Sequence, residues 1–350
     1  MKFKNLFFLA ALGLTASATL TSCEDILGHW ERPTGAAVTI YSFSLQDLSE
    51  AAITATALKV TDQAGTEIAT AESDGKYTIN STAIGSAATD LWLEATTATG
   101  NYIAKAKVSE LSTISESGKL KMATLGNIIG ADGKFYADKT AVVDASTTGA
   151  AMIVYVGNEG ETNTTYNHGL AIALTDANSG FPCNWRTTGS GTDLDKQYDK
   201  WCLSTDADAN TDMAGIANTA TLKGIGTAYA AATAADGYSV DGFTPATYGF
   251  SGWFLPSAGQ WYKFFNGMCN LSWTAFGYSG EGGSGFSTVN GKFTTAGYTD
   301  AKFGNNTSYW SSSEYDGGSV VGVYFDSSSG VQVTRFGKDS SNSVRSFLAF

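Results

Sequence analysis

The strongest constraint on the fold is the pattern of apolar runs and tight turns near the C-terminus. Residues 320–326, 331–336 and 343–350 are predicted strands, and the polar segments 327–330 and 337–342 are predicted turns. Connections this short join strands that run antiparallel to their neighbours. The sequence therefore predicts a three-stranded meander at this end of the chain.

Alternation along the predicted strands separates a core face from an outward face. Side chains two residues apart share a face of a strand. In the first strand, Tyr324 therefore lies opposite its apolar neighbours. We assign four apolar side chains of the meander to the core: Val323, Phe325, Val344 and Leu348.

Length and composition place the chain in a β-rich class. Its 350 residues suggest about two domains. The 40 glycines favour turns and strands over long helices. We predict a mainly β fold with an α+β part. A net charge of −12, with only 21 basic residues, argues against a nucleic-acid partner.

The N-terminus has the features of an export signal. Two lysines precede the apolar run 6–14, which is too short to span a bilayer core about 30 Å thick. Residues 20–23 (LTSC) resemble the lipobox of bacterial lipoproteins. The resemblance implies that residues 1–22 are a lipoprotein signal peptide and that Cys23 is lipidated. Lipid chains at Cys23 would anchor the protein in the outer membrane.

The residues after the predicted anchor indicate a short tether and a location. Residues 23–35 are predicted to form this lipidated tether. Glu24 and Asp25 follow the anchor directly and resemble the surface-export signal of lipoproteins from the Bacteroides group. We expect the protein to be exposed at the cell surface.

Two domains are predicted beyond the tether. Residues 36–125 contain short alternating runs separated by polar turns, which is typical of an immunoglobulin-like β-sandwich. We interpret it as a spacer. Residues 126–350 form the second domain, with buried strands and helices expected in four segments: strands at 151–156 and 169–174, helices at 213–231 and 256–265.

Three motifs in the second domain carry a resemblance to a known family. They are WFLPSAGQW at 253–261, YWSSSE at 309–314 and VRSFLAF at 344–350. Together they resemble the C-type-lectin-like domain of Bacteroides-group lipoproteins, which is related to the fold of formylglycine-generating enzymes. The resemblance implies this fold for residues 126–350 and a structural role for Trp310 and Glu314.

The same tail resembles the variable proteins that diversity-generating retroelements diversify. In those proteins, mutagenesis at template adenines, mostly in Asn codons, rewrites a C-terminal repeat. Such changes to the first two bases of an Asn codon cannot produce Lys, Glu, Gln, Met or Trp. Between Asp316 and Ser343 only Gln332 and Lys338 belong to that set. The resemblance implies that the meander is a ligand-binding surface of variable sequence.

The candidate ligand-binding residues lie on the meander and its turns. A binding surface needs mixed side chains on a rigid support, and Tyr and Arg are effective contact residues. Because side chains alternate, these positions cannot all share one face. The candidates are Asp316, Ser319, Val321, Tyr324, Asp326, Ser328, Val331, Thr334, Arg335, Phe336, Asp339, Ser340 and Asn342.

The sequence offers little support for an enzyme. His168 has no neighbouring Cys or Ser motif, so we interpret it as a surface or packed histidine. Formylglycine-generating enzymes use cysteines near the end of this fold, and no cysteine follows Cys269 here. We therefore expect no catalytic residues and no enzymatic activity.

A calcium loop and a disulfide remain open alternatives. Oxygen-bearing side chains alternate over residues 206–212, as in calcium loops, but Thr211 and Ala217 replace the Gly and Glu of an EF-hand. A structural calcium ion is compatible with this loop, as is a polar loop in which Asp212 caps the next helix. No cofactor or metal ligand is assigned. Cys183 and Cys202 could pair or stay free.

The sequence as a whole predicts a surface lipoprotein that binds a protein or glycan on another surface non-covalently. The first alternative is a fimbria-like adhesin subunit in which the tail is structural. The second is a non-canonical enzyme of the formylglycine-generating-enzyme fold.

Overall fold

The computed structural model describes most of the chain beyond the predicted tether. It covers residues 38–158, 160, 162, 165–187, 192–194, 209–226, 228–271 and 283–350. The predicted signal peptide, Cys23 and the tether lie outside the described residues, as do Cys202 and residues 206–208 of the candidate calcium loop. Within the described part, no helix is long and apolar enough to cross a membrane.

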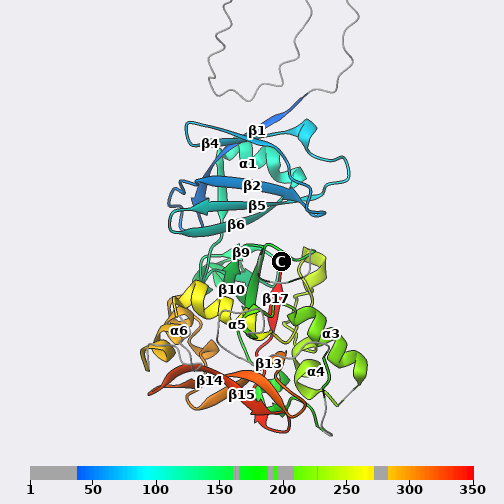
Figure 1. The fold of residues 1–350 in the computed structure, drawn as a ribbon. Coiled ribbons are helices and arrows are strands. Elements are labelled where there is room, and N and C mark those ends of the chain that lie inside the picture. The colour runs from blue at the N-terminus through cyan, green and yellow to red at the C-terminus, as the bar shows by residue number, and fades with distance from the viewer. Residues whose placement is uncertain are drawn as a thin grey trace, which may run out of the picture.

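The first part of the chain forms two sheets around one core (Figure 1). Its elements are β1 (Ile40–Asp47), β2 (Ala57–Asp62), β3 (Thr70–Ser73), β4 (Lys76–Asn80), β5 (Asp90–Thr97), β6 (Gly100–Lys107), α1 (Leu111–Ser117) and β7 (Lys119–Met122). The sheet orders are β3-β4-β1-β7 and β2-β5-β6. Phe43, Ile79 and Leu93 are buried between them. A β-rich fold is confirmed here; its immunoglobulin-like class stays a prediction.

The second part mixes sheets with helices, as an α+β fold does. Its strands are β8 (Ile128–Gly130), β9 (Phe135–Tyr136), β10 (Gly149–Val156), β11 (Gly169–Ala173), β12 (Cys183–Asn184), β13 (Thr307–Glu314), β14 (Ser319–Asp326), β15 (Gly330–Gly337), β16 (Ser341–Asn342) and β17 (Phe347–Ala349). Its helices are α2 (Lys139–Asp144), α3 (Gly215–Ile225), α4 (Ala230–Asp236), α5 (Ala258–Lys263) and α6 (Gly283–Thr295). The sheet orders are β17-β11-β10-β8-β9, β13-β14-β15 and β12-β16.

The predicted buried strands β10 and β11 are confirmed, and the predicted helices are confirmed with shifted ends. The helix expected over 213–231 is divided into α3 and α4, because Gly226, at φ 142°, ends α3. The helix expected from Pro256 begins one residue after the N-cap Ser257, whose hydroxyl accepts the N–H of Gln260. Pro256 thus precedes the helix rather than opening it.

The meander is present, but its third strand was wrongly assigned. β14 and β15 form an antiparallel pair in register over eight residue pairs, and the third strand of their sheet is β13. Residues 343–350 instead end in β17, which pairs with β11 in the central sheet. Ser251 N–H and Phe254 N–H donate to Ala349 O and Phe347 O on the other side of β17. A segment buried on both faces belongs inside the domain and not at the edge of a meander.

The two parts of the chain share an apolar core. The Trp92 ring from β5 stacks on His168, with centroids 4.8 Å apart, and on Phe350, at 5.8 Å. Glu94 contacts His168 Nδ1 beside this stack. Phe350 is fully buried, and its carbonyl accepts the N–H groups of His168 and Gly169. Of the two interpretations given for His168, a surface or a packed histidine, the structure supports the packed one.

We predict that Trp92→Ala lowers the free energy of unfolding by about 3–5 kcal/mol, because it removes a buried ring and leaves a cavity between the two parts. Urea unfolding followed by tryptophan fluorescence and circular dichroism measures the change. The control is Val143→Ala, an apolar residue that is 63% exposed and should change stability by less than about 0.5 kcal/mol. A Trp92→Ala protein as stable as the control would contradict the shared core.

Candidate binding surface

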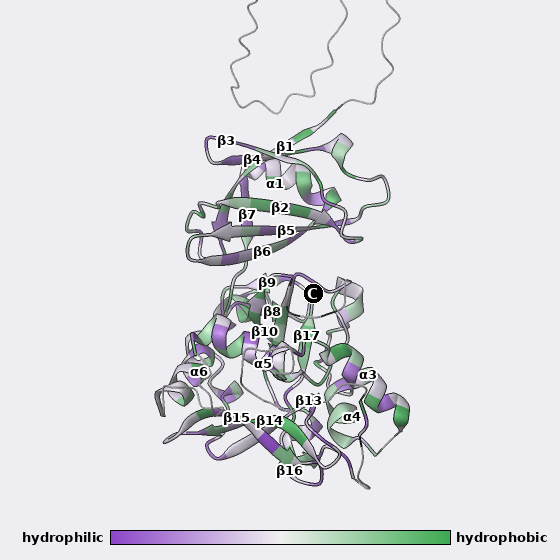
Figure 2. Cartoon of the chain, in the orientation of Figure 1, coloured by the Kyte–Doolittle hydropathy of each residue, from purple (hydrophilic) through white to green (hydrophobic). Residues whose placement is uncertain are grey.

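The meander is held rigidly because the apolar side chains of its inner face are buried. Val321, Val323 and Phe325 of β14 and Val331 and Val333 of β15 pack in the core of the second part. The helices α5 and α6 lie against this face (Figure 1). Figure 2 shows both hydrophilic and hydrophobic stretches along β14 and β15. The core assignment of Val323, Phe325, Val344 and Leu348 is confirmed.

The outer face of the meander presents side chains from all three strands. Cross-strand register places Ser308, Tyr324 and Gln332 in one row. Tyr324 is half-buried, and its hydroxyl donates to Asn306 Oδ1 at 2.9 Å. Thr334, also half-buried, lies in the next row opposite Gly322. We call this half-buried set, with Phe336, the outer face.

Phe336 closes one end of the outer face. Its half-buried ring meets the ring of Trp310 edge-on, with centroids 6.0 Å apart. A Cβ on Gly322 would lie 2.8 Å from the Phe336 ring and 2.7 Å from Tyr309 O, so only glycine allows the ring to lie there. The Trp310 indole is buried and donates to Cys183 O at 2.7 Å.

Asp326 organises the turn between β14 and β15. Its Oδ1 accepts the hydroxyls of Ser328 and Ser329, at 2.5 and 2.7 Å, and their N–H groups, at 2.9 and 2.6 Å. These bonds favour the charged form and lower the pKa of Asp326. Asp326 and Ser328 therefore belong to a turn that these bonds hold in one conformation, at the edge of the outer face.

A second group of candidates lies at a separate corner. The Arg335 guanidinium lies over the Tyr315 ring, 5.2 Å from its centroid. Asp316 Oδ1 accepts the N–H of Gly318 at 2.8 Å, which lowers the pKa of Asp316, with a smaller effect from Arg335. Ser319 is half-buried beside them. Arg335 and Phe336 thus belong to different surfaces, as alternation along β15 requires.

Three candidates are corrected by the structure. Val321 and Val331 are fully buried in the core, because both lie on the inner face of the meander. Asn342 lies in β16, where it pairs with Cys183 of β12, and it is only 6% exposed. Asp339 is exposed and Ser340 is half-buried in the turn before β16, where the Asn184 amide bonds to both carbonyls.

Sequence reasoning missed Gln332 and Ser308 on the outer face. Gln332 has the same parity along β15 as Thr334, so alternation alone could have found it. Ser308 could not be found in this way, because the strand that carries it was not recognised as part of the meander.

A buried carboxylate fixes the end of β13. Glu314 is fully buried, and its oxygens accept the N–H groups of Asp193 at 2.9 Å and Leu194 at 2.8 Å. Lys338 Nζ contacts Glu314 as well. The structural role predicted for Glu314 and Trp310 is confirmed by these buried contacts.

The ion network extends from Glu314 through a second carboxylate. Lys338 Nζ lies 2.8 Å from Asp193 Oδ2, and Arg186 Nη1 lies 2.5 Å from Asp193 Oδ1. Burial would raise the pKa of Asp193, but hydrogen bonds from Lys338, Tyr229 and Arg186 outweigh it and lower the pKa. The network joins β15 to the segment beside β12.

Metal and thiol chemistry is limited in the described part of the chain. It contains no group of three His, Cys, Asp or Glu side chains that could hold a metal ion. Asp212 accepts the N–H of Ala214 just before α3, at 3.0 Å, and the hydroxyl of Ser313, at 2.6 Å. Cys183 and Cys269 are free thiols, and burial raises their pKa to about 11 and about 12.

Comparison with known proteins gives one distant structural likeness. No family model and no curated protein matches the chain. A fimbrial protein from Bacteroides ovatus has a similar structure at a TM-score of 0.40 and 14% identity, over 89% of this chain and 71% of that one. A likeness this distant assigns neither family nor function.

We predict that Lys338→Met lowers the free energy of unfolding by about 3–5 kcal/mol, because it leaves Glu314 and Asp193 buried without their ammonium partner. Thermal and urea unfolding measure the change. The matched control is Lys121→Met, which breaks the exposed pair with Glu50 and should change stability by about 0–1 kcal/mol. Equal effects of the two substitutions would show that the network does not hold the sheet.

Proposed function

We propose that this chain is a lipid-anchored, surface-displayed protein that binds a protein or glycan non-covalently through the outer face of its meander. The observation that carries the proposal is the contrast between the two faces of β14 and β15. The apolar side chains of the inner face, from Val321 to Val333, are buried, whereas Tyr324, Thr334 and Phe336 on the outer face are only partly covered.

Rigidity supports this proposal energetically. Ordering a flexible side chain on binding costs about 0.5–1.5 kcal/mol, and loops that must be ordered cost more. Here Tyr324 is already held by Asn306, and the turn after β14 is held by Asp326. A ligand would therefore meet side chains that have lost much of this freedom on folding.

The side chains of the outer face are suited to recognition. Tyr and Phe bury a large area with few rotatable bonds, and the Tyr hydroxyl and the Gln332 amide add directional hydrogen bonds. Arg335 at the neighbouring corner would widen the contact area. This is the mixture found in antibody combining sites.

The position of the meander also favours a binding role. The described chain enters through β1 at one end of the molecule, and β14 and β15 lie at the opposite end (Figure 1). With an anchor at Cys23, the first part of the chain would act as a spacer and hold the outer face away from the outer membrane. We propose binding without a chemical step, because Glu314 and Asp326 are engaged in holding the meander.

We further propose that the second part belongs to the C-type-lectin-like class and that its tail is diversified by a retroelement. The support is the order of the three motifs in the sequence. Tyr324, Gln332 and Thr334 would tolerate such variation, because they are partly exposed and lie opposite the buried apolar residues of the inner face.

We predict that the double variant Tyr324→Ala/Phe336→Ala reduces binding at least tenfold while the protein stays folded. Bacteria displaying the full-length chain are mixed with a panel of bacterial and human cells, and adhesion is counted by flow cytometry. The control is Tyr262→Ala, a half-buried tyrosine on α5 whose hydroxyl also bonds an Asn side chain. Unchanged adhesion of the double variant would contradict the proposed surface.

The diversification proposal has a genomic test. We predict a near-copy of the DNA that encodes residues 309–350, with adenines at the codons of outer-face residues, close to a reverse-transcriptase gene. A genome that holds neither the copy nor the gene would refute diversification and leave the binding proposal standing.

A further inference from the structure

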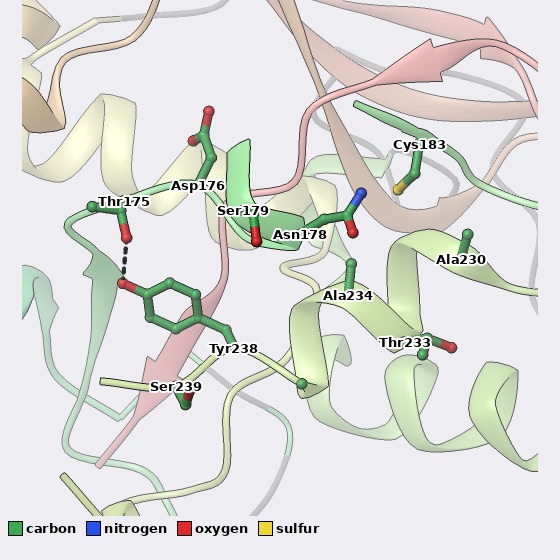
Figure 3. Close-up of a pocket in the computed structure, with 11 residues that line it drawn as sticks. Thr175, Asp176, Asn178, Ser179, Cys183, Ala230, Thr233, Ala234, Tyr238 and Ser239 are labelled. Carbon is green, nitrogen blue, oxygen red and sulfur yellow. Dashed lines mark hydrogen bonds between the residues drawn. The ribbon is translucent and has the colours of Figure 1, made fainter. Parts of the chain in front are cut away.

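An open cavity of about 660 Å³ lies apart from the outer face, between α4 and the segment that follows β11 (Figure 3). This volume lies within the range of about 300–1,000 Å³ typical of small-ligand sites. One wall is the turn Asn178–Gly180, and the other includes Thr233 and Ala234 of α4. The small residues Ala230, Ala234 and Gly237 leave the space open.

The lining combines small apolar residues with polar ones, and its one charged residue is a carboxylate. It carries hydroxyl groups from five residues: Thr175, Ser179, Thr233, Tyr238 and Ser239. Thr175 Oγ1 and Tyr238 Oη are hydrogen-bonded to each other at 2.8 Å, as the dashed line in Figure 3 shows. None of the described lining residues is Lys, Arg or His.

The one carboxylate and the one thiol of the lining are not free to react. Asp176 accepts Arg345 Nε at 2.5 Å and the Tyr309 hydroxyl at 3.0 Å, so its charge is already balanced. Burial raises the pKa of Cys183 to about 11, so this thiol is protonated at neutral pH. The cavity therefore matches a neutral ligand better than an anion or a cation.

The turn at the cavity wall is held in an unfavourable backbone conformation. Asn178, Ser179 and Gly180 have consecutive positive φ angles of 54°, 55° and 81°. For residues other than glycine this conformation costs about 1 kcal/mol or more, and such residues gather at ligand-binding sites. The Asn178 amide donates to Phe181 O at 2.9 Å and holds the turn.

The strained turn presents an exposed aromatic ring. Phe181 is 70% exposed, although a large apolar side chain is normally covered. It directly follows the turn and lies two residues from the lining residues Ser179 and Cys183. The face of an aromatic ring carries partial negative charge and attracts the C–H groups of a partner.

We propose that this cavity binds a neutral saccharide, independently of the outer face. The hydroxyl and amide groups of the lining would hydrogen-bond the sugar hydroxyls, and the Phe181 ring would pack against the C–H face of a sugar unit at the rim. The lack of a basic lining residue disfavours sialylated and sulfated glycans.

The test uses the purified full-length chain in detergent micelles on an array of neutral, sialylated and sulfated oligosaccharides. We expect binding to neutral glycans, and at least tenfold weaker binding for Thr233→Trp, which fills the cavity from α4. The matched control is Thr221→Trp, the same change at an exposed position on α3 outside the cavity. Equal binding by the two variants, a preference for acidic glycans, or no glycan binding would each overturn the proposal.

Two milder variants separate the cavity from folding and from the outer face. Phe181→Ala should weaken glycan binding at least fivefold with unchanged thermal stability, whereas Val143→Ala, another exposed apolar residue, should not. The double variant Tyr324→Ala/Phe336→Ala should bind glycans like the parent chain. Loss of glycan binding in that double variant, with Phe181→Ala unaffected, would assign the saccharide to the outer face and refute the cavity.

Discussion

The packing of the inner face of the meander against a cluster of aromatic rings is the interaction on which the rest of the structure depends. Phe325 stacks on Phe303 with centroids 4.1 Å apart, and the Trp261 ring lies beside both. The Trp261 indole also donates to Trp310 O at 3.3 Å. Because one face of the sheet is fixed in this way, the opposite face can carry polar side chains without loss of order.

A network of buried ion pairs fixes the meander where the aromatic core ends. Glu314 and Asp193 lie where apolar packing ends, and Lys338 and Arg186 neutralise them. Such a network contributes little net stability compared with apolar packing, but it requires one geometry. It therefore fixes the covered end of the outer face, and Tyr324 at the other end stays partly exposed. Order at one end and exposure at the other suit a binding surface.

Local pattern predicted the strands better than it predicted their partners. Alternation gave β14, β15 and the core positions Val323 and Phe325, because a half-buried strand repeats every two residues. It could not assign residues 343–350, whose pairing with β11 depends on contacts far apart in the sequence. The stack of Trp92 on Phe350 is non-local in the same way. Val321 and Val331 have the same parity as Val323 and Val333, so alternation places them on the buried face and not among the contact residues.

Amide hydrogen exchange of the unbound full-length chain tests most directly whether the meander is a preformed platform. The account predicts that the amides of β14, and those amides of the edge strand β15 that bond to β14, exchange only through near-global unfolding, as slowly as those of the buried strand β10. Fast exchange of these amides at a free energy several kcal/mol below that of β10 would contradict it, because the platform would then form only on contact with a ligand.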